Sequence, residues 1–346
     1  MRAVTFHGPL DVKVENVDDP VIQDDNDVII KVTSAAICGS DMHVYDGRMQ
    51  LPGTGWTIGH EYIGEVVETG AGAGNFRPGD RVVGSFVSSC GDCYFCKSGW
   101  PSVCTKQQTF GFMQLAGAQA EYLRVPNGHY TLEKVPDGLS DEKAIFVGDI
   151  FSTGYFAADR GEIKPGDTVA VVGAGPVGLF AQMGALTFEP KQVFAIDQMP
   201  ERLEMAKKIG ATPIDMSKED PKAIIRDATE GRGADVVLEA VGIEASLKDC
   251  WKYVRPAGTI SAVGMYTEPE FPFPMFLSFL RDITFKIGMC PVKRYMGDLM
   301  GKIQEGKADP SQIITHRLPM SEAAHGYDIF TNRKENCIKV LLDPQK

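Results

Sequence analysis

The arrangement of apolar and polar positions changes along the chain near residue 150. Up to about residue 130, short runs rich in β-branched residues alternate with turns of Gly, Pro and Asp, which is the pattern of an antiparallel, barrel-like unit. These runs are residues 2–7, 11–17, 27–37, 62–70, 80–87 and 120–126. The first part of the chain is therefore predicted to be rich in β-strands.

After residue 150, apolar strands alternate with helical stretches. The predicted strands are residues 168–173, 192–197, 234–242, 259–264 and 283–289, and the helices between them include residues 201–211, 221–231 and 244–258. Such alternation requires right-handed crossovers and predicts a parallel sheet covered by helices on both faces. The last fifty or so residues are helical with a closing strand at 337–342, and we expect them to return to the first unit.

One segment resembles a membrane span by length alone. Residues 168–188 contain no charged side chain, and this length could cross a bilayer. The β-branched run at the front, four glycines and Pro176 favour a buried strand, a tight turn and a packed helix instead.

Length and composition limit the classes of function. A chain of 346 residues is long enough for two domains, and 43% apolar with 23% charged residues is typical of globular proteins. The net charge is -11 and no block of Lys or Arg occurs, which argues against nucleic acid or anionic lipid as a partner and favours a small molecule. The first ten residues lack the apolar core of a signal peptide, so we expect a cytoplasmic protein with reduced thiols.

A glycine-rich segment carries the first chemical signal. In VVGAGPVG, Gly173, Gly175 and Gly178 have G-x-G-x-x-G spacing around Pro176 and Val177, after a predicted strand and before a predicted helix. The first glycine permits a tight turn, the second lets the backbone approach a pyrophosphate, and the third allows the helix to pack closely on the strand. In this context the motif predicts a dinucleotide site.

The acidic residue at the end of the next strand indicates which dinucleotide. Asp197 follows Gly178 by nineteen positions, and its carboxylate can accept hydrogen bonds from a ribose 2′-hydroxyl but would repel a 2′-phosphate. NAD is therefore expected rather than NADP, with strand termination or helix capping as the alternative role of Asp197. Arg202 could contact adenine or ribose, or instead hold a phosphate.

Four cysteines lie within fifteen residues. Cys90, Cys93, Cys96 and Cys104 give C-x-x-C-x-x-C followed by a seven-residue gap. Four thiolates close a tetrahedral shell around zinc and leave no position for substrate, so structural zinc is expected. Another metal, including an iron–sulfur cluster, and unmetallated thiols remain as alternatives.

A catalytic metal would need ligands elsewhere, and the β-rich part offers Cys38 in AAICGSDMH and His60 in GHEYIGEVVETG. An isolated cysteine is more often a small core residue. Together with the four-thiol segment and GAGPVG, however, these stretches resemble the zinc-containing medium-chain dehydrogenase/reductase family of alcohol dehydrogenases. The stretch from Gly59 through Gly64 and Gly70 is similar to the family's zinc signature, and the resemblance covers nearly the whole chain.

The resemblance implies an α/β protein of two domains with the active site in the cleft. Residues 1–152 and 290–346 would form a GroES-like β-barrel catalytic domain. Residues 153–289 would form an inserted Rossmann domain, a doubly wound parallel sheet that binds NAD.

The resemblance also implies roles for individual residues. Cys38, His60 and Asp149 match the catalytic zinc ligands, although many relatives have cysteine at the third position. Glu61 resembles a residue that can approach the fourth coordination position. Ser40 and His43 match the first relay and the exit base of a proton path. Aromatic side chains near the family's substrate-facing stretches are Trp56, Phe86, Phe110 and Tyr266.

The sequence therefore predicts a dehydrogenase with one catalytic and one structural zinc per chain. The expected reaction is the reversible oxidation of primary or secondary alcohols to aldehydes or ketones by hydride transfer to NAD. A polyol, sugar or amino-alcohol dehydrogenase of the same superfamily is the alternative within enzymes, and a zinc-ribbon binding protein without catalysis is the alternative outside them. The resemblance implies a homo-oligomer, either a dimer or a tetramer.

Overall fold

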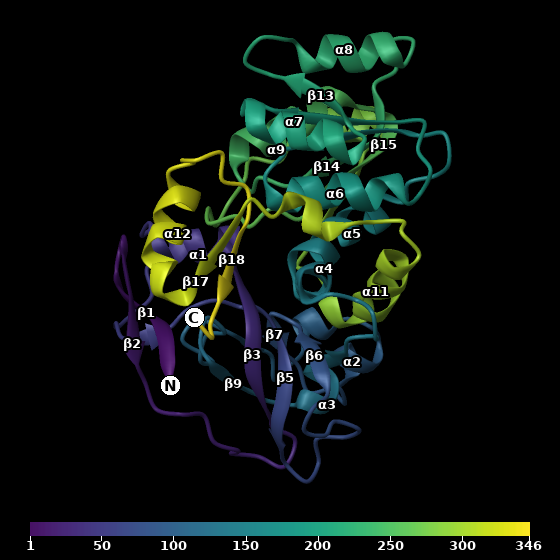
Figure 1. The fold of residues 1–346 in the computed structure, drawn as a ribbon. Helices are drawn as coiled ribbons and strands as arrows, with labels where there is room; N and C mark the ends of the chain where they lie inside the picture. Colours follow the sequence, from purple (N-terminus) through teal and green to yellow (C-terminus); the bar gives the residue numbers. More distant parts are fainter. The chain divides into compact units, whose positions relative to one another are not determined.

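The computed structural model describes residues 1–346, and the chain divides into two compact units (Figure 1). The first unit is formed by Met1–Ser152 together with Pro291–Lys346, so it is built from both ends of the chain. The second unit is formed by Thr153–Cys290. Each unit has its own sheets and its own apolar core.

The first unit is built around a mixed sheet in which β3 (Val28–Ile37) is central. This strand pairs antiparallel with β5 (Glu61–Thr69) on one side and with β18 (Val340–Asp343) on the other. Figure 1 shows the C-terminal strand β18, in yellow, beside β3, in purple. The path of the sheet continues through β6 (Arg81–Gly84), β10 (Leu132–Lys134) and β17 (His316–Pro319), and β9 (Tyr122–Val125) pairs with β3.

Smaller elements complete this unit. A three-stranded sheet contains β1 (Arg2–Gly8), β2 (Asp11–Asn16) and β4 (Trp56–Thr57), and a two-stranded sheet contains β7 (Val87–Ser88) and β8 (Gln108–Thr109). The helices are α1 (Gly39–Tyr45), α2 (Tyr94–Lys97), α3 (Gly128–Thr131), α4 (Asp141–Ala144), α11 (Met296–Gln304) and α12 (Ala323–Thr331).

The second unit is a six-stranded parallel sheet in the order β13-β12-β11-β14-β15-β16. This is the 3-2-1-4-5-6 order of a dinucleotide-binding Rossmann fold, in which the strand order reverses between the first and fourth strands. All five positions of β11 are buried, as expected for an inner strand covered on both faces. The strands are β11 (Thr168–Val172), β12 (Gln192–Asp197), β13 (Thr212–Asp215), β14 (Ala234–Glu239), β15 (Val254–Ala262) and β16 (Thr284–Ile287).

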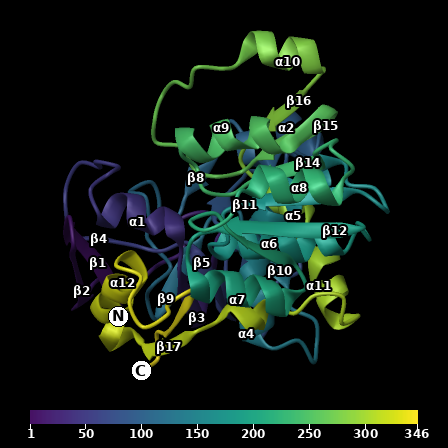
Figure 2. The same cartoon turned by 90° about the horizontal axis from the view of Figure 1, so that it is seen from above.

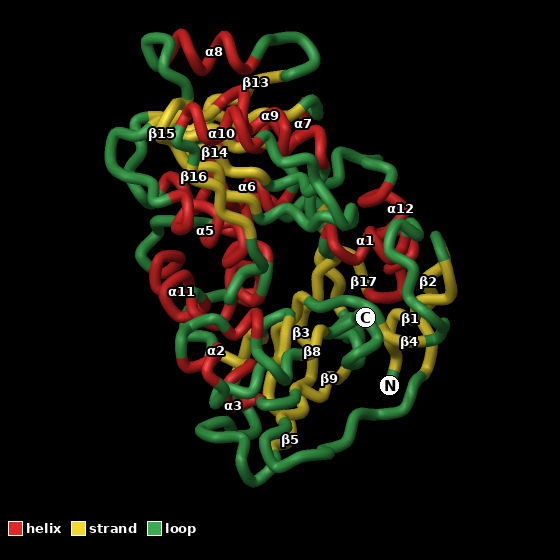
Figure 3. Tube along the Cα trace, turned by 180° about the vertical axis from the view of Figure 1, so that it is seen from behind, coloured by secondary structure: helices red, strands yellow, loops and turns green.

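Helices cover both faces of this parallel sheet, as Figure 3 shows. Right-handed crossovers place α6 and α7 on one face and α8, α9 and α10 on the other, because the chain reverses direction along the sheet after β13. Consistent with this arrangement, α6 packs on α7 and α8 packs on α9. The helices are α5 (Ile150–Gly161), which begins at the boundary between the units, α6 (Pro176–Leu186), α7 (Pro200–Ile209), α8 (Pro221–Ala228), α9 (Glu244–Tyr253) and α10 (Met275–Arg281).

The structure differs from the predicted elements at several places, and short strands such as β10 and β17 were not predicted. Strand β13 was not predicted, because it has only four residues and contains Pro213. Helix α9 ends at Tyr253 and β15 begins at once, within the predicted helix 244–258, since Pro256 cannot continue a helix. The predicted strand 80–87 is interrupted between β6 and β7.

The uncharged segment 168–188 forms strand β11, the glycine turn and helix α6. No helix in the structure has both the length and the apolar character needed to cross a membrane. The strand–turn–helix prediction for this segment is therefore confirmed.

Candidate functional site

Three potential metal ligands come together in the first unit because two strands are antiparallel. Cys38 follows the end of β3, and His60 precedes the start of β5. The pairing of Ala36 with Glu61 places these two ends side by side. Asp149 follows a 3-10 turn at 145–148, which is held against the sheet by a hydrogen bond from Phe86 N to Gly148 O (3.0 Å).

The donor atoms of these residues have the spacing of a tetrahedral metal shell. Cys38 Sγ lies 3.4 Å from Asp149 Oδ2, and His60 Nε2 lies 3.2 Å from the same oxygen. Ordinary bond lengths to zinc place the ligand atoms of a tetrahedron about 3.3–3.6 Å apart. All three side chains are buried, and their ligand atoms lie within 4.8 Å of one another. Three protein donors of this chemistry fit a catalytic zinc, whose fourth position is reserved for another ligand.

A buried carboxylate that the sequence analysis did not single out orients the histidine. Asp41 Oδ1 lies 3.0 Å from His60 Nδ1, and Asp41 Oδ2 accepts a hydrogen bond from Cys38 N (3.0 Å). One carboxylate thus lies against the imidazole and binds the backbone at the cysteine, as carboxylates in the outer shell of metal sites do. The spacing could have revealed it, because Asp41 is the third residue of a helix capped by Cys38.

The surroundings shift the proton affinities of two ligands. Burial raises the pKa of Cys38 to about 11, and the Asp149 carboxylate adds to this shift. For His60, burial opposes the charged form, but the carboxylate of Asp41 and the Cys38 thiolate raise its pKa well above the usual value. A bound cation would offset these effects, since it binds the thiolate and the neutral imidazole.

The proposed relay residues lie on the same helix as Cys38. Ser40 Oγ donates to Cys38 Sγ (3.2 Å) and lies 3.0 Å from His60 Nε2, so its hydroxyl contacts two of the candidate ligands. His43 is half-buried and lies three residues further along α1, on the same face of the helix.

Glu61, the first residue of β5, is held by a buried lysine. Lys339 donates to Glu61 Oε2 and to Ile37 O (2.7 Å), and both charged side chains are fully buried. The other oxygen, Glu61 Oε1, has no hydrogen-bond partner. Burial raises the pKa of Glu61 to about 7, against the attraction of the Lys339 ammonium. Lys339 has no local sequence signal, because its partner lies 278 residues earlier.

The four cysteines of the C-x-x-C-x-x-C segment form a second cluster. Cys104 Sγ lies 3.4 Å from Cys90 Sγ and 3.8 Å from Cys93 Sγ, and sulfur atoms around zinc are about 3.8 Å apart. The backbone N–H of Cys96 and other donors lower the pKa of Cys93 to about 6, which favours its thiolate. Four sulfur donors fit a closed structural zinc site.

The glycine turn of the second unit has the form that the motif predicts. Gly173 has a φ of +93°, and a side chain at Gly178 would overlap the carbonyl oxygen of Gly173. A Cβ at Gly175 would meet only Arg202 Nη1, at 3.7 Å, so one side of this residue remains accessible to a ligand. Helix α6 begins at Pro176 without a side-chain cap, so its backbone N–H groups suit a phosphate.

Asp197 also organises this turn. Its Oδ2 accepts from Ala174 N (2.7 Å), and its Oδ1 accepts from Gln198 N (2.7 Å) and Met199 N (3.0 Å). Arg202 Nη1 lies 3.8 Å from Asp197 Oδ2. The carboxylate therefore has a structural contact to the glycine turn in addition to any contact with a ribose.

The four aromatic residues singled out in the sequence lie in different surroundings. Phe86 packs edge-on against the His60 ring, with centroids 6.2 Å apart. Phe112, which was not singled out, lies closer to the same ring, at 5.5 Å. The remaining three contact other partners: Trp56 packs on Phe6, Phe110 packs on Tyr62, and Tyr266 donates to Glu239.

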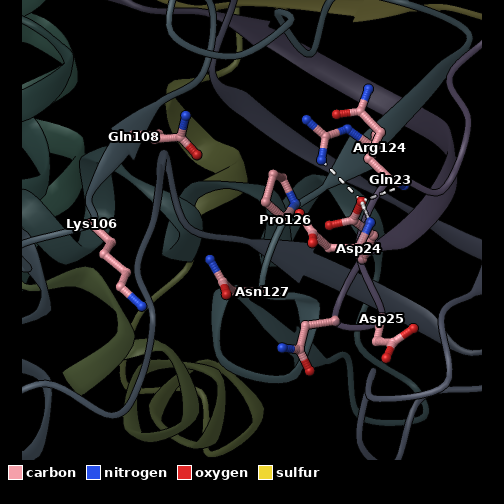
Figure 4. A pocket seen from close by; sticks show the side chains of 10 residues that line it. Gln23, Asp24, Asp25, Lys106, Gln108, Arg124, Pro126 and Asn127 are labelled. Atoms are coloured by element: carbon pink, nitrogen blue, oxygen red, sulfur yellow. Dashed lines mark hydrogen bonds and ion pairs between the residues drawn. The ribbon is translucent and has the colours of Figure 1, made fainter.

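A polar pocket of about 750 Å³ in the first unit contains none of the candidate site residues (Figure 4). Its wall includes the ion pair between Arg124 Nη1 and Asp27 Oδ2 (3.0 Å). The metal clusters and the glycine turn therefore lie outside it.

Comparison with known proteins identifies the family of this chain. A family model described as "Alcohol dehydrogenase GroES-like domain" matches residues 24–137, and one described as "Zinc-binding dehydrogenase" matches residues 176–301. Zinc-type alcohol dehydrogenase B of Aspergillus flavus is 40% identical over 342 residues, which cover 96% of this chain and 79% of that protein. The chain belongs to the zinc-containing medium-chain dehydrogenase family.

Two further relatives show the range of this similarity. The structure of alcohol dehydrogenase TADH from Thermus sp. ATN1 matches this dehydrogenase with a TM-score of 0.95 and 42% identity over 99% of both chains. Sorbitol dehydrogenase of Bacillus subtilis is 32% identical and covers 100% of this chain and 98% of its own length. The predicted fold class, a GroES-like domain with a Rossmann domain, is confirmed.

Proposed function

We propose that this dehydrogenase oxidises primary and secondary alcohols to aldehydes and ketones, reversibly, with zinc and NAD. The observation that carries the proposal is the buried cluster of Cys38, His60 and Asp149, which offers three donors with tetrahedral spacing. A zinc ion held there would act as a Lewis acid on an alcohol oxygen, and NAD would accept the hydride.

The residues around the cluster have distinct tasks in this proposal. The Asp41 carboxylate lies beside His60 Nδ1, and His60 Nε2 lies 3.2 Å from Asp149 Oδ2 in the cluster. The Ser40 hydroxyl contacts two ligands and is placed to receive the proton of the alcohol, and His43, one helical turn away, passes it to solvent. Glu61 presents one unpartnered oxygen at the buried strand end, which supports a part in ligand exchange at the metal.

The four-thiol cluster is proposed to hold a second, structural zinc. All four donors come from the protein, so the shell is closed to substrate. Metal-bound thiolates require reduced cysteines, and this supports a reducing compartment such as the cytoplasm. None of the eight cysteines forms a disulfide in the structure.

NAD is the proposed cofactor, at the glycine turn of the second unit. The accessible side of Gly175 and the uncapped start of α6 would receive the pyrophosphate, with Arg202 3.7 Å from the position of a Gly175 Cβ. Asp197 lies at the end of β12, where a carboxylate favours a free ribose 2′-hydroxyl over a 2′-phosphate.

The second unit also supports the proposal of a homo-oligomer. Helix α10 exposes five large apolar side chains, and β16 is an edge strand with an unpaired side. Contiguous exposed apolar surface beside a free sheet edge favours pairing with a second copy of this chain. The exposed apolar residues of α10 are Met275, Phe276, Leu277, Phe279 and Leu280.

A polyol or sugar alcohol is the second candidate substrate class. The similarity to sorbitol dehydrogenase over the full chain favours it. The two candidates differ in the number of hydroxyl groups that the substrate must carry.

The test is NADH formation by the zinc-loaded protein with a matched panel of primary, secondary and polyhydric alcohols. We expect turnover of simple alcohols, with NAD preferred to NADP. Turnover of polyhydric alcohols alone would move the assignment to the second candidate, and no turnover of any alcohol would overturn the proposal.

A further inference from the structure

A buried carboxylate in the second unit has no charged partner. Glu239, the last residue of β14, is fully buried. Its Oε1 accepts hydrogen bonds from Val241 N (2.9 Å), Gly242 N (2.9 Å) and Ser246 Oγ (2.7 Å). Its Oε2 accepts from the Tyr266 hydroxyl (2.5 Å). All four donors are neutral, so the protein keeps a costly group at this position without an ion pair.

These hydrogen bonds join three segments at the carboxyl edge of the sheet. Oε1 binds the loop 240–242 and the first turn of α9, and Oε2 binds the loop that follows β15. Strands β14 and β15 are parallel neighbours, so both loops leave the sheet at the same edge (Figure 2). A side chain at Gly264 would overlap the backbone of Gly242, which shows that the two loops pack backbone against backbone.

The loop 240–242 also forms a wall of the dinucleotide turn. Ala240 N donates to Val172 O (3.0 Å), and a Cβ at Gly173 would lie only 2.5 Å from Val241 Cγ2. Although it is apolar, Val241 is 41% exposed at this position. An apolar side chain that is exposed beside the glycine turn can contact a bound ring or ribose.

The position of this wall relative to the sheet indicates which half of the dinucleotide it meets. A dinucleotide lies across the point where the strand order reverses, with one nucleoside over each half of the sheet. Here that point lies between β11 and β14. Asp197 ends β12 on one side, and Glu239 ends β14 on the other.

We propose that Glu239 and Tyr266 are positioning residues that fix the loop 240–242 for the nicotinamide nucleoside, while Asp197 serves the adenosine side. This inference rests on the proposed use of NAD. Burial and the Glu239 carboxylate raise the pKa of Tyr266, so its hydroxyl keeps the proton that it donates. The bond between these two side chains ties the loop after β14 to the loop after β15.

The test compares the binding of NADH with the binding of AMP, which carries only the adenosine half. The variants are Tyr266→Phe, which removes one donor and keeps the ring, and Glu239→Gln, which keeps the acceptor oxygen. Tyr253→Phe is the matched control, because Tyr253 belongs to the same apolar cluster and is absent from the Glu239 hydrogen bonds. Dissociation constants come from NADH fluorescence and from calorimetry with AMP.

We expect Tyr266→Phe to weaken NADH binding by about tenfold, as for loss of one hydrogen bond to a charged group, with AMP affinity changed less than about twofold. Glu239→Gln should bind NADH with an affinity between those of Tyr266→Phe and the wild type. Tyr253→Phe should bind NADH and AMP as the wild type does. Equal loss of NADH and AMP affinity, or unchanged NADH affinity in Tyr266→Phe, would overturn the inference. Failure of the wild type to bind NADH would instead overturn the proposed function on which the inference rests.

Discussion

The buried pair of Lys339 and Glu61 gives a prediction that can be worked from the structure. Lys339 Nζ binds Glu61 Oε2 and the carbonyl of Ile37, and no part of either charged side chain reaches solvent. Lys339 immediately precedes β18, Ile37 ends β3, and Glu61 begins β5. The ammonium therefore joins three strands next to the candidate metal cluster.

Replacing Lys339 by Met keeps the length of the side chain and removes the charge. Glu61 would then be buried without a counter-charge, and the Ile37 carbonyl would lose a donor. Breaking a buried pair in this way costs about 3–5 kcal/mol of unfolding free energy. The double variant Lys339→Met/Glu61→Gln removes both charges, so it should be more stable than Lys339→Met alone.

Urea unfolding of the zinc-loaded protein, followed by circular dichroism, measures these differences. Lys334→Met is the matched control, because Lys334 pairs with Asp328 at 2.8 Å on the exposed surface of the same C-terminal segment. The control should shift the unfolding midpoint little, since exposed pairs are screened by solvent. A loss of less than about 1 kcal/mol of unfolding free energy in Lys339→Met would refute the reasoning, and so would a double variant that is less stable than Lys339→Met.

Three further predictions concern the metal and dinucleotide sites. Asp149→Asn should weaken zinc binding at the catalytic cluster by about 100-fold or more, because the binding free energy of a four-ligand zinc site is about 2.5–4 kcal/mol per ligand. Two zincs retained per chain after chelator dialysis would contradict the ligand role of Asp149. Asp197→Ala should lower the selectivity for NAD, measured as the ratio of NAD to NADP turnover, and an unchanged ratio would remove the role assigned to it. In zinc-free protein at pH 7, Cys93 should be alkylated faster than Cys96, because its pKa is lowered to about 6 while that of Cys96 is raised; peptide mapping with and without zinc checks this order.

The sequence predicted well those features that depend on residues close together in the chain. The glycine turn, the strand before it and the helix after it follow from backbone geometry at Gly173 and Gly178, so the motif sufficed. The four cysteines lie within fifteen residues, and their spacing alone determines a compact cluster.

The parts that the sequence did not reveal depend on distant contacts. Asp41 is fully buried against His60, nineteen residues away, and its position three residues after Cys38 indicates a helix cap but does not indicate the histidine as a partner. Lys339 looks like a surface residue in a strand, and only the return of β18 to β3 buries it. Glu239 likewise appears as an ordinary strand residue until the loops after β14 and β15 close over it.

The most direct test of two separate metal sites is the zinc content per chain of the wild type and of Cys38→Ser, together with NADH formation from a secondary alcohol. The account predicts two zincs in the wild type, one in the variant, and loss of turnover in the variant. A wild type with one zinc, unaffected by Cys38→Ser, would show that only the four-thiol cluster binds metal and would contradict the catalytic site proposed for Cys38, His60 and Asp149.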